Sequence, residues 1–182
     1  MEWLASIAER GVRVRILTNS LASTDVSVVH AGYSKYRIPL LRAGVEIYEV
    51  NHKLTPAERR EKKGPSGSSK ASLHAKSFVF DREEVFIGSL NLDPRSVVEN
   101  TELGIVITSP EMATLMAEEL DANLARVAFR LELGKDDRGV DQIVWHGKVG
   151  DDDKTFTVDP YTSFWRRAGV GFLGLFPIES QL

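Results

Sequence analysis

The first fifty residues alternate twice between a helical pattern and a strand pattern, and each helical pattern ends at a glycine. Apolar residues at helical spacing precede Gly11, and residues 12–17 then alternate between apolar and basic side chains. A second helix is predicted over residues 26–42, bent or shortened by Pro39, and an alternating strand is predicted over residues 45–50. This order predicts an α/β fold, a mixed sheet flanked by helices.

Composition narrows the class of protein. The 182 residues suffice for a buried core, and we expect residues 1–182 to form a single domain. The absence of cysteine excludes a disulfide scaffold and thiolate chemistry. A net charge of −3 argues against a general nucleic-acid binder but permits an enzyme with a local positive site for a phosphodiester. No apolar run reaches the ~20 residues of a membrane span and no signal-peptide pattern begins the chain, so we expect a soluble or peripheral cytoplasmic protein.

The remainder of the chain changes character after residue 50. Residues 51–72 are charged and then rich in glycine and serine, which predicts a flexible surface loop. The elements predicted after it are strands over 73–81, 85–87 and 102–108, a helix from Ser109 to about Phe129, and a hairpin over 140–158.

The stretch from His74 to Asn91 carries the most chemistry. His74 and Lys76 are two residues apart on a predicted strand and therefore share a face. Gly88 permits a close backbone approach just before Ser89. A histidine nitrogen can attack phosphorus, a lysine ammonium offsets charge on the phosphate oxygens, and serine and asparagine hydrogen-bond the phosphate. These residues predict attack on a phosphodiester, and we expect no metal or other cofactor.

Three further residues have open roles at this site. A nucleophilic histidine needs an acceptor on its far ring nitrogen, and Glu102, at the start of the next predicted strand, is the candidate. The alternative for Glu102 is a solvated carboxylate at a strand end. Asp81 closes the strand of His74 where the chain turns. Asn19, at the end of an earlier strand, either reaches the site or only turns the chain.

The spacing of these residues resembles a known family. The pattern His74-x-Lys76-x4-Asp81-x6-Gly88-Ser89-x-Asn91 matches the HKD signature of the phospholipase D superfamily. The surrounding sequence resembles the C-terminal half of bacterial cardiolipin synthases over nearly the whole chain. The stretches that carry this second resemblance are residues 19–26, 30–33, 88–96, 162–167 and 175–179.

The resemblance implies a phospholipase D-like fold that contributes one HKD half-domain to an active site built from two. It implies a phosphatidyltransferase that passes a phosphatidyl group from an anionic glycerophospholipid to an alcohol through a phosphohistidine. By this resemblance, His74 is one of the two histidines and Lys76 is the phosphate clamp. Asp81 is the motif acid, with a mainly structural role. Ser89 and Asn91 line the phosphate site, and Glu102 is the carboxylate that orients the histidine.

The chain departs from the family pattern because it holds one complete motif. His146, Lys148 and Asp153 repeat the H-x-K-x4-D spacing, but no buried strand and no Gly-Ser-x-Asn follows, so we interpret this match as coincidental. The second motif is expected from an N-terminal domain of a longer protein or from a second copy in a homodimer. The abrupt start in a helix and the resemblance to cardiolipin synthases favour the first, and the isolated chain is then expected to be nearly inactive.

Two other functions remain open, a homodimeric phosphodiesterase or nuclease and an inactive half-domain that binds lipid or phosphate. The acidic balance and the aromatic, basic segment 159–182 favour lipid over nucleic acid and a peripheral position on the cytoplasmic face of the inner membrane. Two alternatives are open for residues 159–182: the segment lies on a membrane surface, or it docks on protein. The basic run (Lys53, Arg59, Arg60, Lys62, Lys63) is a solvated face or attracts anionic lipid. The helical face of His30, Tyr33 and Arg37 lines a headgroup pocket or packs against the core.

Overall fold

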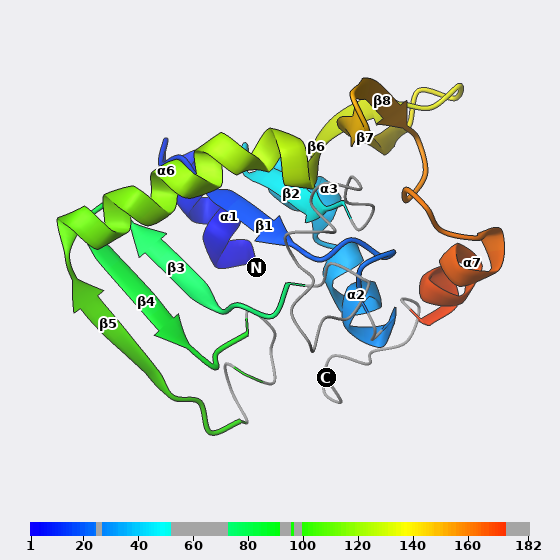
Figure 1. Cartoon of the computed structure of the whole chain (residues 1–182). Coiled ribbons are helices and arrows are strands. Elements are labelled where there is room, and N and C mark those ends of the chain that lie inside the picture. The colour runs from blue at the N-terminus through cyan, green and yellow to red at the C-terminus, as the bar shows by residue number, and fades with distance from the viewer. Residues whose placement is uncertain (25–26, 52–72, 92–95, 97–99, 174–182) are drawn as a thin grey trace, which may run out of the picture.

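The computed structural model describes residues 1–24, 27–51, 73–91, 96 and 100–173 (Figure 1). The described helices are α1 (Glu2–Glu9), α2 (Ser27–Ser34), α3 (Arg37–Arg42), α6 (Pro110–Val127) and α7 (Phe164–Leu173). The described strands are β1 (Arg15–Thr18), β2 (Glu46–Val50), β3 (Ser77–Phe80), β4 (Glu84–Gly88), β5 (Gly104–Thr108), β6 (Ala128–Lys135), β7 (Asp141–Val149) and β8 (Asp152–Phe156). The predicted fold class, a mixed α/β arrangement of sheets flanked by helices, is confirmed.

The strands form two sheets. Five strands are paired in the order β1-β2-β6-β7-β8, and three in the order β3-β4-β5. Only β1 and β2 are parallel among these pairs, and the chain between them contains α2 and α3, as a parallel connection requires. The other pairs are antiparallel, so the first sheet is mixed.

The main core lies on one face of the five-stranded sheet, beneath α1 and α3. Alternate residues of the strands point to this face, which is why apolar side chains recur at every second position. The buried residues of this core are Leu4, Leu40, Val45, Ile47, Phe129, Leu131 and Trp145.

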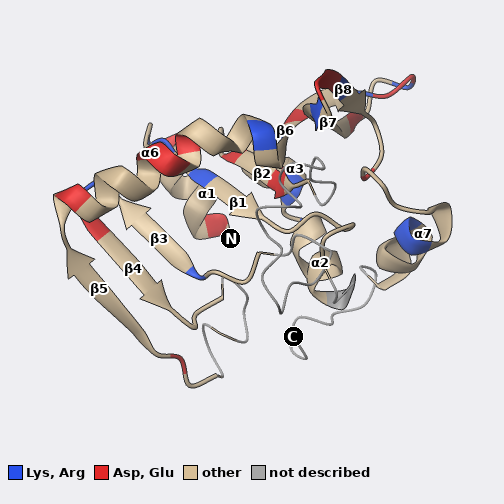
Figure 2. Cartoon of the chain, viewed as in Figure 1, with Lys and Arg blue, Asp and Glu red and all other residues tan. Residues whose placement is uncertain are grey.

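Helix α6 runs across both sheets and contacts β3 and β4 of one and β6 and β7 of the other (Figure 1). The Ser109 side chain accepts a 3.3 Å hydrogen bond from a backbone N–H of the first turn, and Pro110 occupies the first helical position, as predicted. The charged side chains of α6 are acidic apart from Arg126 in its last turn (Figure 2). Asp121 of α6 forms ion pairs with Arg15 of β1 and with Arg82, which follows β3. One carboxylate therefore ties the two sheets together.

Two predicted boundaries are wrong. The helix predicted over 26–42 is divided into α2 and α3, and Pro39 lies in the first turn of α3, where its missing N–H costs no helical hydrogen bond. The helix predicted to reach Phe129 ends at Val127, and Phe129 lies in β6, whose first two residues are buried, because its ring fills the core.

Other predicted elements agree with the structure or lie outside it. The hairpin over 140–158 is confirmed as β7 and β8, with Gly150 at φ +67° in the turn. The strand expected from residue 73 begins only at Ser77. The predicted loop over 51–72 lies outside the described residues apart from Asn51. The predicted C-terminal segment is helical over Phe164–Leu173, and its last nine residues lie outside the described part.

Candidate active site

His74 and Lys76 lie together in the irregular segment that leads into β3. The Lys76 Nζ atom lies 3.1 Å from Nε2 and 3.3 Å from Nδ1 of the His74 ring, and it also donates to the His74 carbonyl oxygen at 3.2 Å. His74 is exposed and Lys76 is partly buried. The structure therefore brings a nucleophilic ring and a cation to one accessible point.

The ends of β4 and β5 bring Ser89 and Glu102 together. The Ser89 hydroxyl donates a 2.5 Å hydrogen bond to Glu102 Oε2 and accepts a 3.1 Å bond from the Leu103 N–H. The Ser89 N–H donates to the Leu103 carbonyl oxygen at 2.8 Å. Ser89 is thus fixed by backbone and side-chain bonds at the same edge of the sheet as Lys76.

The electrostatics of Glu102 favour its ionised form. The hydrogen bond from Ser89 is the main reason why the pKa of Glu102 lies below its ordinary value. Slight burial acts in the opposite direction, whereas hydrogen bonds from Ser96 and Asn100 and the charge of Lys76 lower the pKa further. Glu102 is therefore a carboxylate at neutral pH, and it is close enough to Lys76 for the charge of the ammonium to affect its pKa.

Gly88 is required for the three strand ends to meet. Its N–H donates to the Lys76 carbonyl oxygen at 3.1 Å. A Cβ at this position would lie 2.5 Å from the Leu103 carbonyl oxygen, closer than real Cβ contacts. The close backbone approach expected at Gly88 is confirmed.

Two motif residues stand apart from this cluster. Asp81 lies in the turn after β3, at φ +53°, whereas His74 and Lys76 precede the strand. Five residues of extended chain separate Lys76 from Asp81 by about 16 Å, so the structure does not bring Asp81 to the histidine. Asn91 is exposed two residues beyond Ser89.

The expected contact between Glu102 and His74 is not among the described interactions. Within the described residues, Lys76 is the polar partner of the His74 ring, and Glu102 bonds to Ser89 and Asn100 instead. The orienting role of Glu102 stays a prediction.

Asn19 reaches the segment that carries His74. Its carboxamide donates to the Leu73 carbonyl oxygen and accepts from the Leu73 N–H, each at 2.8 Å. Of the two alternatives for Asn19, reaching the site or only turning the chain, the first is favoured, because its side chain holds the residue directly before His74. The signal in the sequence was its place at the carboxyl end of a strand, where side chains from neighbouring strands meet.

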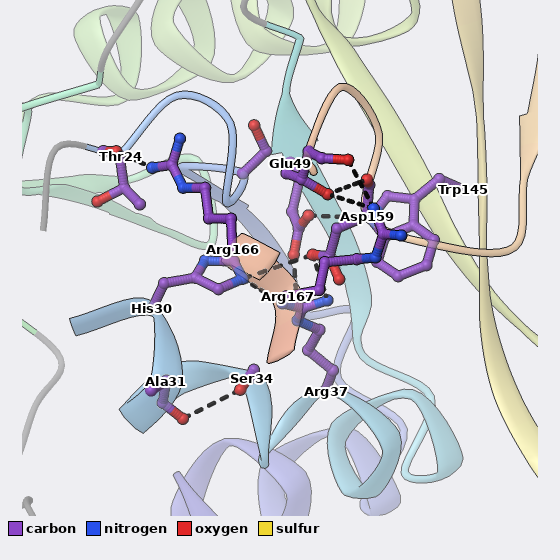
Figure 3. Close-up of polar contacts among 12 residues, drawn as sticks. Thr24, His30, Ala31, Ser34, Arg37, Glu49, Trp145, Asp159, Arg166 and Arg167 are labelled. Carbon is purple, nitrogen blue, oxygen red and sulfur yellow. Dashed lines mark hydrogen bonds and ion pairs between the residues drawn. The ribbon is translucent and has the colours of Figure 1, made fainter. Parts of the chain in front are cut away.

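A second polar cluster lies inside the protein (Figure 3). The Arg37 guanidinium forms 3.2 Å ion pairs with Glu49 and with Asp159, and Trp145 Nε1 donates to Glu49 at 2.9 Å. His30 Nε2 lies 3.6 Å from the Asp159 carboxylate. His30 and Arg37 are each 3% exposed and Glu49 is fully buried. Packing, and not a headgroup pocket, is therefore the role of this helical face.

The charges of this buried cluster stabilise one another. Burial alone would lower the pKa of Arg37, but the carboxylates of Glu49 and Asp159 raise it above its ordinary value. Burial acts to raise the pKa of Asp159, yet the neighbouring His30 side chain and the charge of Arg37 leave it lowered. The sequence held one signal for this cluster, because Glu49 shares the core face of its strand with Val45 and Ile47.

Helix α7 turns its arginines toward the protein. Arg166 donates to the Thr24 carbonyl oxygen at 2.8 Å, and Arg167 donates to the Thr162 carbonyl oxygen at 2.6 Å. The side chains that face solvent from this helix are Phe164, Trp165 and Phe172, at 65%, 81% and 61% exposed.

The repeated H-x-K-x4-D spacing lies in the β7–β8 hairpin. Lys148 lies opposite Asp153 in the register of the hairpin. The Nδ1 atom of His146 and the Thr155 hydroxyl share a 3.2 Å hydrogen bond. His146, Lys148 and Asp153 line an open groove of about 490 Å³ between α6 and the sheet. The hairpin interpretation of this motif is confirmed.

Neither a metal site nor a membrane span is found in the described part of the chain. Its histidine and acidic side chains nowhere gather in a group of three that could hold a metal ion. None of its helices has both the length and the apolar character needed to cross a bilayer.

Curated relatives resemble this chain over part of their length. Cardiolipin synthase C of Escherichia coli K12 is 41% identical over 176 residues, which cover 97% of this chain and 36% of that protein. An uncharacterized protein of Helicobacter pylori strain 26695 is 41% identical over 104 residues, 57% of this chain and 20% of that protein. Cardiolipin synthase A of Yersinia pseudotuberculosis is 29% identical over 126 residues, 69% of this chain and 22% of that protein. The chain thus spans about a third, or less, of the length of these relatives.

A structure comparison and a family comparison complete these findings. Nuc of Salmonella typhimurium, a phospholipase D family member, matches with a TM-score of 0.47 and 19% identity over 72% of each chain. The family model described as "Cardiolipin synthase, PLD-like domain" matches residues 1–124. Because that match covers more than half of the sequence, the chain belongs to the cardiolipin synthase PLD-like domain family of the phospholipase D superfamily.

Proposed function

We propose that this chain supplies one half of the active site of a phosphatidyltransferase of the cardiolipin synthase type. The observation that carries the proposal is the position of Lys76 against the exposed His74 ring, with Ser89 at the adjoining strand end. The names of the two cardiolipin synthases among the relatives support the same reaction class.

The chemistry follows from the residue types. One of the two histidines, His74 or that of a second HKD half-domain, attacks the phosphorus of a glycerophospholipid, so that an N–P bond forms and the bond to the leaving alcohol breaks. The other histidine gives its proton to that alcohol. An acceptor alcohol then attacks the phosphohistidine, loses its proton to that other histidine and breaks the N–P bond. Lys76 offsets the charge that develops on the phosphate oxygens. The Ser89 hydroxyl, which donates its one hydrogen to Glu102 in the free chain, has to turn to the phosphate to hydrogen-bond it.

The second half-domain comes from the same longer protein or from a second copy of this chain. Apolar side chains exposed beside Glu102 support a docking surface there, since Leu103 is 81% and Ile105 57% exposed. Asp81, distant from the ring, supports the motif through the turn after β3, and Asn91 lines the phosphate site from the loop after β4.

The substrate places the protein at a membrane surface, on the cytoplasmic face of the inner membrane. The exposed aromatic side chains of α7 (Phe164, Trp165 and Phe172) suit the interfacial region of a bilayer. Sedimentation with phosphatidylglycerol vesicles tests this contact, and Trp165→Ala is expected to weaken it. Binding that is unchanged in this variant contradicts the contact.

The deciding experiment compares the isolated chain with a longer gene product on phosphatidylglycerol vesicles and on DNA, with His74→Ala as the control. Lipid transfer that requires the longer product and His74 is the expected result. Cleavage of DNA by the short chain, lost in His74→Ala, overturns the proposal in favour of a homodimeric nuclease. Phosphate or lipid binding without turnover by either form indicates an inactive half-domain.

A further inference from the structure

Asn19 closes a two-bond clamp on Leu73, the residue directly before His74. Its carboxamide Nδ2 donates to the Leu73 carbonyl oxygen and its Oδ1 accepts from the Leu73 N–H, both at 2.8 Å. The side chain thus pairs with a backbone residue as a neighbouring strand would, across 54 residues of sequence. The clamp joins the end of β1 to the segment that leads into β3.

The clamp is itself held by a buried turn. The Ser23 hydroxyl lies 3.3 Å from Asn19 Oδ1 and 3.1 Å from the Ser20 carbonyl oxygen, and these two acceptors share its one hydrogen. The Ser23 N–H closes the turn on the Ser20 carbonyl oxygen at 3.0 Å, and both serines are at most 2% exposed. Because Oδ1 accepts from the Leu73 N–H while Nδ2 donates to the Leu73 carbonyl oxygen, these bonds fix which way the carboxamide points, and the shared Ser23 hydrogen supports the same orientation.

Among the residues that the structure describes, few others restrain the backbone around His74. β3 begins only at Ser77, so His74 lies outside the strand ladder. The next fixed point is the Lys76 carbonyl oxygen, which accepts from the Gly88 N–H at 3.1 Å. His74 therefore stands between two anchored residues, Leu73 and Lys76.

We propose that Asn19 is a positioning residue, which sets the place of the His74 ring relative to Lys76 and Ser89. This inference rests on the proposed function, in which His74 is one of the two histidines that react at the phosphodiester, as nucleophile or as proton donor. A reacting group displaced by about 1 Å loses about 100-fold in rate, because the reacting atoms no longer meet in line.

Two variants remove the clamp in different ways. Asn19→Ala deletes both hydrogen bonds to Leu73. Asn19→Asp keeps an acceptor for the Leu73 N–H but sets a carboxylate oxygen against the Leu73 carbonyl oxygen, with no hydrogen to donate. We expect kcat to fall about 10- to 100-fold in Asn19→Ala and also to fall in Asn19→Asp, while KM stays within about twofold.

Asn51→Ala is the matched control. Like Asn19, which is partly buried, Asn51 directly follows a strand of the five-stranded sheet; it is buried, and its carboxamide donates to the Lys148 carbonyl oxygen at 2.9 Å. That bond leads to β7, which carries none of the proposed site residues. We expect Asn51→Ala to lower the melting temperature but to keep kcat within about twofold of the wild type.

Two measurements test the inference. The kinetic one uses whichever form, this chain or a longer product, carries out transfer. The other follows amide hydrogen exchange at Leu73 and His74 in the isolated chain, where Asn19→Ala is expected to raise exchange about tenfold or more and Asn51→Ala is not.

Each outcome decides a separate point. Exchange that is unchanged in Asn19→Ala overturns the clamp. Faster exchange with unchanged kcat, or an equal loss of kcat in Asn51→Ala, overturns the positioning role. If no wild-type form transfers a phosphatidyl group, the proposed function fails and positioning for transfer fails with it, while the exchange result still decides whether the clamp exists.

Discussion

Two clusters in this protein combine a histidine, a basic side chain and a carboxylate, and they differ in exposure and in how their charges are paired. The outer cluster, His74, Lys76 and Glu102, lies at strand ends with its histidine exposed. The inner cluster contains His30, Arg37, Glu49 and Asp159 beneath α2 and α3, and each of its charges faces an opposite charge (Figure 3).

The difference in pairing separates a structural role from a chemical one. A buried charge is tolerated only when it is paired, and Arg37 is paired with two carboxylates. Within the described residues Lys76 forms no ion pair, which is consistent with its proposed role against a phosphate. Residue type alone does not distinguish the two clusters, but burial and the pairing of opposite charges do.

The largest expected effect is on activity at the outer cluster. His74→Ala removes one of the two histidines of the proposed reaction and is expected to lower phosphatidyl transfer by about 10³-fold or more. Because His74 is exposed, the free energy of unfolding is expected to change by no more than about 0.5 kcal/mol. Transfer assays and urea denaturation of the same preparation measure the two quantities. Transfer that survives in His74→Ala contradicts its role as one of the two histidines.

The second effect concerns stability at the inner cluster. Arg37→Ala leaves Glu49 buried without its cation and is expected to lower the free energy of unfolding by about 3–5 kcal/mol. Arg13→Ala is the control, because Arg13 pairs with Glu46 at 2.7 Å on the surface and such a pair contributes about 0–1 kcal/mol. Urea denaturation of both variants tests the contrast, and equal losses would contradict the structural role of burial.

Local patterns predicted much of the outer cluster. His74 and Lys76 stand two residues apart, Gly88 precedes Ser89, and all four act within one short stretch of chain. The partner of Glu102 was not predictable in this way. The register of β4 on β5, which sets Gly88 opposite Gly104, places Ser89 beside Glu102, and that register forms between segments distant in sequence.

The same limit applies to the fold. Helix and strand order follows from periodicity within each segment, and the α/β arrangement was predicted on that basis. Whether Phe129 ends a helix or begins a strand is decided by the core that it fills, which no local pattern contains. The burial of Arg37 likewise depends on Glu49 and Asp159, which approach it from β2 and from the chain after β8.

A smaller effect is expected in the titration of Glu102. Its lowered pKa means that the carboxylate is favoured in the folded protein, an advantage present at neutral pH and lost as the pH falls through that pKa. Ser89→Ala removes the main cause, so the pKa of Glu102 is expected to rise toward its ordinary value. NMR titration of the carboxyl carbon measures it. Ser34→Ala, which removes a hydroxyl bonded to the Ala31 carbonyl oxygen, is expected to leave the pKa of Glu102 unchanged.

The smallest effect is expected where the motif spacing recurs in the β7–β8 hairpin. His146→Ala combined with Lys148→Ala deletes both side chains of the repeated pattern, yet transfer is expected to stay within about twofold and unfolding within about 0.5 kcal/mol. The physical reason is that Lys148 faces Asp153 across a surface hairpin, with no glycine and serine at an adjoining strand end. If this double variant instead lost transfer as fully as His74→Ala, the chain would hold both histidines of the reaction. The requirement for a second half-domain would then be wrong.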